Sequence, residues 1–194
     1  YAAYRLPPLN LGRLNPNVRV RISVHHANAH DPTSHREAVK LRKAWVEKLS
    51  GDRPLRTHDN YSHAGGAQAG VPVYFPRAIA RDVKSLRPIC NGEYIEVNAP
   101  SPRNGKPPIN LAVNHLNIYT TARFWWDTEQ DVDALLEEYY GKFYGPAAAA
   151  MKAFVEYGES NWRDMNKDVP KIEKALALIE AAVAAVDGDS IYAR

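Results

Sequence analysis

The sequence predicts an α/β fold, in which a parallel sheet alternates with helices and a helical tail follows. Strand-like and helix-like segments alternate with short connections between residues 18 and 126. Such alternation is typical of a parallel sheet that is covered by helices. From Asp127 onward the apolar residues recur only at helical spacing. The chain has 194 residues, 45% hydrophobic and 24% charged, which is enough for a sizeable core.

The first unit begins with residues 18–24, which alternate apolar and polar side chains as a strand does. The pattern at 34–37 resembles a capping box and predicts the start of a helix that stops at Gly51. Arg19 and Arg21 fall on one face of this strand, which does not suit a strand buried on both faces. They belong either to the entry of the strand or beside carboxylates elsewhere in the protein.

Two similar units follow. Residues 54–61 predict a short strand, and 76–86 predict a helix after the Gly-rich loop 63–70. Residues 92–97 predict a third strand, and 116–126 predict the helix that completes its unit. The first two-thirds of the chain therefore contain three successive strand–helix units.

The remaining residues predict helices only. A second capping pattern lies at 128–131, and Gly145 and Pro146 end one helix and begin another. The last predicted helix begins at Asp168 and ends near Gly188. This pattern predicts an antiparallel helical bundle packed on the sheet-containing part.

Composition excludes several classes of protein. Cys90 is the single cysteine, which excludes an internal disulfide and a multi-cysteine zinc site and predicts a buried structural thiol. The net charge of +3 combines a basic stretch, residues 1–110, with an acidic one, residues 111–194. A basic first part favours an acidic ligand, or else simply solvated helix faces. The sequence contains no basic run interleaved with aromatics, which a nucleic-acid-binding protein would have, and no apolar run long enough to span a membrane.

Five short segments carry a resemblance to a known family. They read PRAIARD at 76–82, GEYIE at 92–96, LNIY at 116–119, RFWWD at 123–127 and FYGPAA at 143–148. In order and spacing they resemble an uncharacterised family, a domain of unknown function found in bacterial, usually exported proteins. That family is grouped with glycoside-hydrolase-like TIM-barrel proteins, near α-glucuronidases and β-hexosaminidases. The resemblance extends to YRLPP at 4–8, and so to nearly the whole chain.

The resemblance implies the C-terminal half of a (β/α)8 TIM barrel over residues 1–126, from the end of strand five to strand eight. Residues 127–194 would be the family's α-helical tail, packed on the barrel. A whole barrel needs about 250 residues, so an N-terminal half is expected to be missing. In the related hydrolases that half carries the acid, on strand four. The resemblance also implies a secreted or periplasmic protein.

Two carboxylates are the predicted catalytic residues. Barrel active sites form at the carboxyl ends of the strands, and glycoside hydrolysis needs two carboxyl groups, one protonated and one ionised. Asp59 and Glu96 end the second and third predicted strands. Glu96 would act as an acid, and Asp59 would orient a hydroxyl or a water, or hold His58. The alternative for both is a structural carboxylate.

The same edge supplies the predicted substrate-binding residues: Tyr4, Arg5, His25, His26, His58, Tyr61 and Asn98. The densest polar cluster, which also includes His30 and Asp31, leaves three alternatives open: hydrogen bonds to a sugar, ordinary loop histidines, and a zinc site. We expect no metal and no cofactor.

These residues predict a fragment of a glycoside-hydrolase-like protein that acts on a polysaccharide or oligosaccharide, acidic ones included, and is inactive alone. The alternative is a non-catalytic carbohydrate-binding or surface-assembly protein on the same fold. The expected partners are a carbohydrate and the missing half of the barrel, with no nucleic acid and no membrane span. The oligomeric state is left open.

Overall fold

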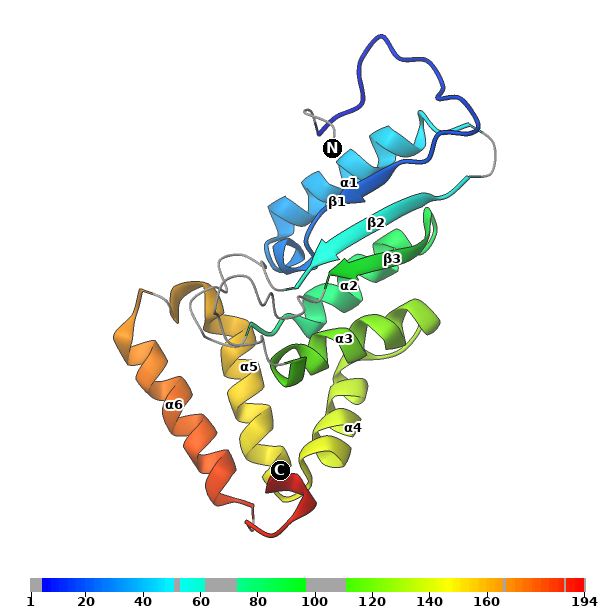
Figure 1. Ribbon diagram of the computed structural model, residues 1–194. Coiled ribbons are helices and arrows are strands. Elements are labelled where there is room, and N and C mark those ends of the chain that lie inside the picture. Colours follow the sequence, from blue (N-terminus) through cyan, green and yellow to red (C-terminus); the bar gives the residue numbers. More distant parts are fainter. Residues whose placement is uncertain are drawn as a thin grey trace, which may run out of the picture.

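The structure is a computed structural model that describes residues 5–50, 53–61, 73–96, 111–165, 167–186 and 188–193. Its first part contains the strands β1 (Arg21–Ser23), β2 (Leu55–Asn60) and β3 (Cys90–Glu96), the 3-10 helix η1 (His26–His30), and the helices α1 (Pro32–Val46), α2 (Pro76–Leu86) and α3 (Leu111–Trp126) (Figure 1). Its second part contains the helices α4 (Val132–Tyr144), α5 (Ala148–Met165) and α6 (Val169–Ala184) and the 3-10 helices η4 (Gly145–Ala147) and η5 (Ile191–Ala193). The predicted strands and helices are confirmed, with ends that differ by a few residues.

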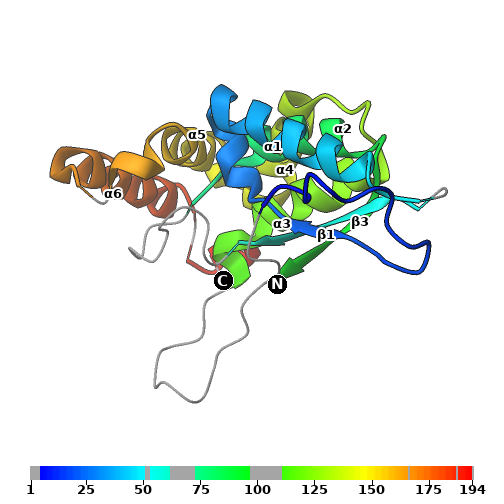
Figure 2. The same ribbon diagram turned by 90° about the horizontal axis from the view of Figure 1, so that it is seen from above.

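The three strands form a parallel sheet in the order β1-β2-β3. Figure 2 shows α1 and α2 on one side of this sheet, and α5 and α6 beside it. Along β2 the residues alternate accordingly, because Leu55, Thr57 and Asp59 are buried and face the helices. No helix of the described residues covers the opposite, open face of the sheet, and Arg21 is exposed there. An arginine on β1 is therefore compatible with this fold, because only one face of the strand is covered.

The prediction of a half TIM barrel is wrong. The described residues form a small sheet of three parallel strands with helices on one face, which is α/β but not half of a barrel. Residues 5–8, expected to end a further strand, form no strand. Pro7 and Pro8 explain this, because proline has no backbone N–H to donate to a sheet. The prediction identified the βα units correctly but assembled them into the wrong architecture.

Two helices begin at a different residue from the one predicted. Asp31, not Ser34, caps α1: its carboxylate accepts the Ser34 N–H at 2.7 Å, with Pro32 at the first helical position. Asp131 caps α4 in the same way, accepting the Ala134 N–H at 2.8 Å. An aspartate followed by a favourable first turn stabilises the start of a helix better than the capping boxes that were predicted.

Two hydrophobic clusters hold the elements together. The larger one joins α2 and α3 to α4, α5 and α6, and Phe75, Ile79 and Phe124 are among its fully buried members. The smaller one lies between α1 and the first two strands, around Leu41 and Leu55. Cys90 is buried, and burial raises the pKa of its thiol, so the predicted structural thiol is confirmed.

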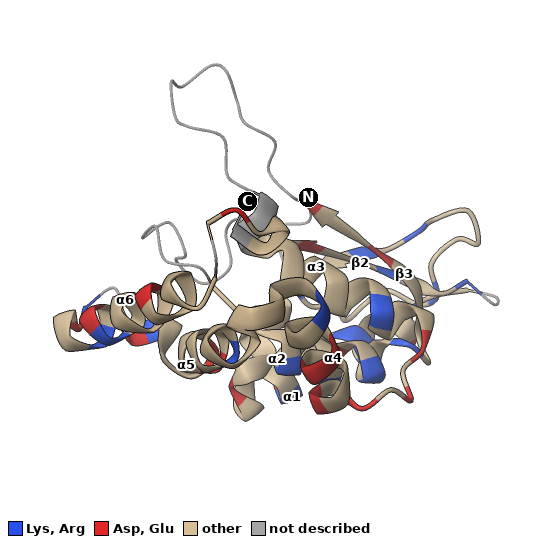
Figure 3. Ribbon diagram, turned by 90° about the horizontal axis from the view of Figure 1, so that it is seen from below, with Lys and Arg blue, Asp and Glu red and all other residues tan. Residues whose placement is uncertain are grey.

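The charge asymmetry of the sequence is visible in the fold. Basic residues appear on α1 and β2, whereas acidic residues predominate on α4 (Figure 3). Among the described residues, no helix combines the length and the hydropathy needed to cross a bilayer.

Candidate functional site

The carboxyl ends of the three strands bring several of the predicted residues to one edge of the sheet. His25 follows β1, Asp59 and Asn60 end β2, and Glu96 ends β3. Asn60 and Glu96 are direct partners in the parallel pairing of β2 and β3. Parallel strands place their carboxyl ends together, and ligand sites in open α/β sheets form outside those ends.

His25 and Asp59 form a hydrogen-bonded pair at this edge. His25 Nδ1 lies 2.7 Å from Asp59 Oδ1, and the His25 side chain is 34% exposed whereas that of Asp59 is 1% exposed. The hydrogen bond to Asp59 raises the pKa of His25 above its ordinary value, although partial burial opposes this. A buried carboxylate thus holds one ring nitrogen of an accessible imidazole.

Asp59 is fixed by more than His25. The backbone N–H of His26 donates to Asp59 Oδ2 at 2.7 Å, and the backbone N–H of Asn60 donates to Oδ1 at 2.6 Å. Burial alone would raise the pKa of Asp59, but the hydrogen bonds from His25 and His26 outweigh it and lower this pKa. Asp59 is therefore an ionised, buried acceptor.

Glu96 is joined to the same group through Asn60. The Asn60 side-chain amide donates from Nδ2 to Glu96 Oε2 at 2.8 Å. His58 Nε2 lies 3.6 Å from the same oxygen, and the Glu96 side chain is 46% exposed. A continuous series of contacts therefore runs from His25 through Asp59 and Asn60 to Glu96, with accessible groups at its two ends.

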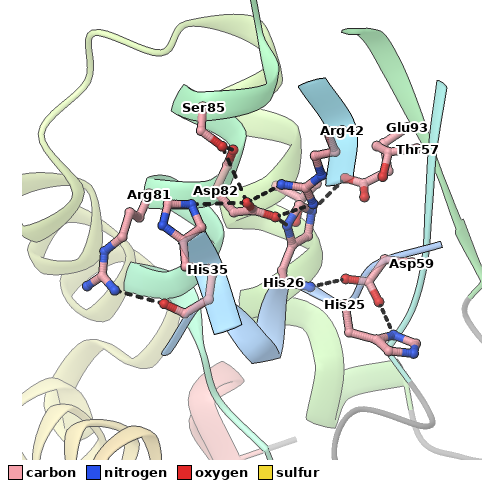
Figure 4. A network of polar contacts seen from close by, with 12 residues as sticks. His25, His26, His35, Arg42, Thr57, Asp59, Arg81, Asp82, Ser85 and Glu93 are labelled. Atoms are coloured by element: carbon pink, nitrogen blue, oxygen red, sulfur yellow. Dashed lines mark hydrogen bonds and ion pairs between the residues drawn. The ribbon is translucent and has the colours of Figure 1, made fainter. Parts of the chain in front are cut away.

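A buried ion network lies behind this edge, between the sheet and the helices (Figure 4). His26 contacts two carboxylates, with Nδ1 at 2.7 Å from Asp82 Oδ2 and Nε2 at 2.8 Å from Glu93 Oε2. Arg42 donates to both oxygens of Asp82, at 2.5 and 2.8 Å. Trp125 Nε1 donates to Glu93 Oε2 at 3.0 Å. The network therefore connects α1, α2, α3, η1 and β3 in one place.

The charges in this network are mutually stabilised. Burial alone would lower the pKa of His26, but Glu93 and Asp82 outweigh it and raise this pKa well above the ordinary value. Burial would likewise raise the pKa of Asp82, but its contacts with His26, His35 and Arg42 hold it far below the usual range. Since both nitrogens of His26 face carboxylates, the imidazole is a cation that donates from both.

One group of residues has the composition of a metal site. Ligand atoms of His26, Asp59 and Glu93 lie within 4.8 Å of one another. Both nitrogens of His26 already donate to carboxylates, so a metal would have to displace the proton on Nε2. The protonated imidazole itself neutralises these carboxylates, and we assign no metal here.

A groove of about 770 Å³ extends from Glu96 over the open face of the sheet and around the edge of β1 to Leu41 and Trp45 of α1. Its charged and aromatic lining consists of Arg5, Arg19, Arg21, Trp45, His58, Tyr94 and Glu96. Tyr94 is 53% exposed. The His58 ring lies 5.2 Å from it, and the Arg21 guanidinium lies 5.5 Å from its centre. The groove thus combines an accessible aromatic ring with hydrogen-bonding groups and an excess of arginine.

Comparison with known proteins identifies the family. The model of a domain of unknown function, DUF4838, matches residues 1–156. The chain belongs to the DUF4838 family. No curated protein and no solved structure matches the chain.

In this DUF4838 chain the predicted site residues separate into accessible and buried positions. Arg5, His58 and Glu96 line the groove, and His25 is accessible at the edge. His26, Asp59 and Tyr61 are buried, and the Tyr61 hydroxyl contacts Thr121 Oγ1. The remaining two, Tyr4 and Asn98, lie outside the described residues, as does the predicted loop 63–70.

Sequence reasoning missed Arg42 and Asp82, which hold the DUF4838 network together. A signal was present, since Asp82 lies between Ile79 and Val83 on the apolar face of α2. Arg42 similarly follows Leu41 on the buried face of α1. A charge on an apolar face indicates a buried partner, because an unpaired buried charge is strongly unfavourable.

Proposed function

We propose that this domain binds an acidic oligosaccharide or polysaccharide in the groove on the open face of its sheet, as part of a glycoside-hydrolase-like protein. The observation that carries the proposal is the combination of exposed Tyr94 with Arg21, His58 and Glu96 in one groove. An aromatic ring offers a flat apolar surface to a sugar ring, and the polar groups fix its hydroxyls.

The excess of arginine supports an anionic sugar. Arg21 pairs directly with Arg56 of β2, and both are exposed. Among the described residues, neither arginine has a carboxylate partner within ion-pairing distance. Like charges at paired positions destabilise a sheet, and a bound carboxylate or sulfate would relieve this repulsion.

Calorimetric titration with a uronic-acid oligosaccharide and a neutral one of equal length tests the proposal. Arg21→Gln should weaken binding of the acidic ligand by about tenfold and leave the neutral ligand unchanged, because a charged hydrogen bond contributes about 1.5–3 kcal/mol. Tyr94→Ala should weaken both ligands roughly tenfold. Trp126→Ala is the matched control, since Trp126 is 89% exposed and lies outside the groove.

The proposal fails if neither oligosaccharide binds, or if both bind and neither groove variant changes the affinity. Equal affinity for the two ligands would retain a sugar site but reject its preference for acidic sugars.

A non-catalytic binding protein is the second candidate, and one observation favours it. Hydrolysis by two carboxyl groups requires both to reach the sugar. The Glu96 side chain is accessible, whereas that of Asp59 is 1% exposed and its oxygens accept hydrogen bonds from the protein. If Asp59 takes no direct part, catalysis at this edge requires another accessible titratable group.

A further inference from the structure

We propose that His25 is the proton-transferring catalytic residue of this edge and that Asp59 is its positioning residue. This inference rests on the proposed binding of a sugar in the groove and adds hydrolysis to it. Glu96 lines the groove, whereas His25 lies outside its lining at the carboxyl edge of the sheet, so the bound sugar has to extend beyond the groove to reach His25. The sequence predicted a catalytic role for Asp59. The proposal replaces it with a positioning role, because Asp59 is buried and His25 is accessible.

The geometry defines which nitrogen of His25 reacts. Ionised Asp59 accepts a hydrogen bond from Nδ1, which lies 2.7 Å from Asp59 Oδ1, so the neutral imidazole carries its hydrogen on Nδ1. Nε2 is then the position that gains and loses a proton. Holding the second nitrogen on a buried carboxylate orients the ring and stabilises the imidazolium, as an acid–base histidine requires.

Asp59 is held rigidly enough to position another residue. Two backbone N–H groups, those of His26 and Asn60, fix its oxygens. The side chain of His26 is in turn held between Asp82 and Glu93. The ring of His25 therefore rests on a carboxylate that the buried network keeps in place, and not on a mobile surface group.

The position of Glu96 supplies the complementary group. Glu96 is partly exposed and is linked to Asp59 through Asn60, so both accessible groups belong to one edge. The imidazolium of His25 gives its Nε2 proton to the glycosidic oxygen as the bond from that oxygen to the anomeric carbon breaks. Glu96 takes a proton from the water whose oxygen bonds to that carbon, and exchange with solvent restores both groups.

The groups around His25 favour its protonated form. Asp59 raises the pKa of His25 above its ordinary value, while partial burial and the cationic His26 oppose this. The shift therefore has the direction that a general acid requires.

The test uses the full-length protein and measures, side by side, its affinity for the uronic-acid oligosaccharide and the release of reducing ends. His25→Gln should lower turnover by roughly 10²- to 10⁴-fold, the usual contribution of general acid–base catalysis, with affinity changed less than about threefold. His115→Gln is the matched control, because His115 is an exposed histidine of α3 outside the groove. It should leave both quantities unchanged.

Asp59→Asn tests the positioning role. The pH–rate profile should show a limb at which the rate falls because His25 loses its proton. Without the carboxylate of Asp59 this limb should move to lower pH, a shift that a purely structural defect would not produce. Asp59→Glu keeps the charge and should retain the pH of that limb, even if turnover falls.

Each outcome decides the matter. The role of His25 is overturned if His25→Gln keeps full turnover, or if the His25 limb of the pH–rate profile does not move in Asp59→Asn. Sugar binding stands in both cases. Binding by the wild-type protein without any release of product overturns catalysis at this edge and leaves the non-catalytic candidate. Absence of binding refutes the proposed function itself, and the inference falls with it.

Discussion

The buried ion network allows a strong prediction about stability. Asp82→Asn removes the carboxylate that Arg42 and His26 share and preserves the size of the side chain. Three short contacts reach that carboxylate, two from Arg42 and one from His26, and all three side chains are at most 1% exposed. The substitution leaves the buried Arg42 without its bidentate carboxylate partner. It leaves the buried His26 with Glu93 as its remaining carboxylate.

The expected loss in the free energy of unfolding is about 3–5 kcal/mol, the usual result of removing one partner of a buried ion pair. The upper end is favoured because each charged hydrogen bond contributes roughly 1.5–3 kcal/mol. Domains are stable by only about 5–15 kcal/mol, so the variant should retain a fold but lose a large part of its stability.

Urea unfolding, followed by tryptophan fluorescence and far-UV circular dichroism, measures this loss. Glu138→Gln is the control, because Glu138 forms an exposed i,i+4 pair with Lys142, and it should leave the urea midpoint unchanged. A loss below about 1 kcal/mol for Asp82→Asn would refute the reasoning, since it would mean that Arg42 and His26 reach water or other partners.

Two further predictions concern the wild-type protein and α3. The pKa of His26 is raised, so its contribution to stability is complete below about pH 6.5 and is lost as pH rises through the pKa of the folded state. The pKa of Asp82 is lowered, so its contribution is present above about pH 3.8 and is lost as pH falls through the pKa of the folded state. Urea midpoints measured across pH should therefore fall on both sides of a mid-pH maximum, and a midpoint that kept rising into the alkaline range would contradict this. Asn117→Leu should lower stability by about 2–4 kcal/mol, because buried Asn117 accepts from the Phe75 N–H and donates to the Val73 carbonyl, which would both lose a partner. An unchanged thermal midpoint for that variant would show that water replaces the amide.

The secondary structure could be predicted because it depends on local patterns. Alternation over 18–24 and 54–61 and helical spacing over 76–86 each report which side of a segment is buried. The assembly of these segments was not predictable in the same way. No short-range sequence pattern distinguishes an open three-stranded sheet from part of a closed barrel. Only the prolines at positions 7 and 8 argued against a further strand.

For the candidate site, the sequence predicts where its residues lie on the sheet but not how they contact one another. Its location follows from a rule about parallel strands, which places His25, Asp59 and Glu96 at one edge. Its construction depends on contacts between residues far apart in the chain, such as His26 with Asp82, 56 positions away, and with Glu93, 67 positions away. Asp59 is buried and contacts His25 and the backbone of His26, which are also distant in the chain. Its place at the end of a short polar strand did not reveal this.

The two faces of the sheet separate stability from the proposed sugar binding. The network on the helical face joins Arg42 of α1 and Asp82 of α2 to Glu93 of β3, so changes there should affect both folding and the placement of His25. The groove on the open face uses Arg21 and Tyr94, whose exposed side chains contribute little to the core. Asp59 belongs to the helical face, where it accepts hydrogen bonds from the His26 backbone and from the ring of the accessible His25. A loss of function through the helical face should therefore be accompanied by a loss of stability, whereas a loss through the open face should not.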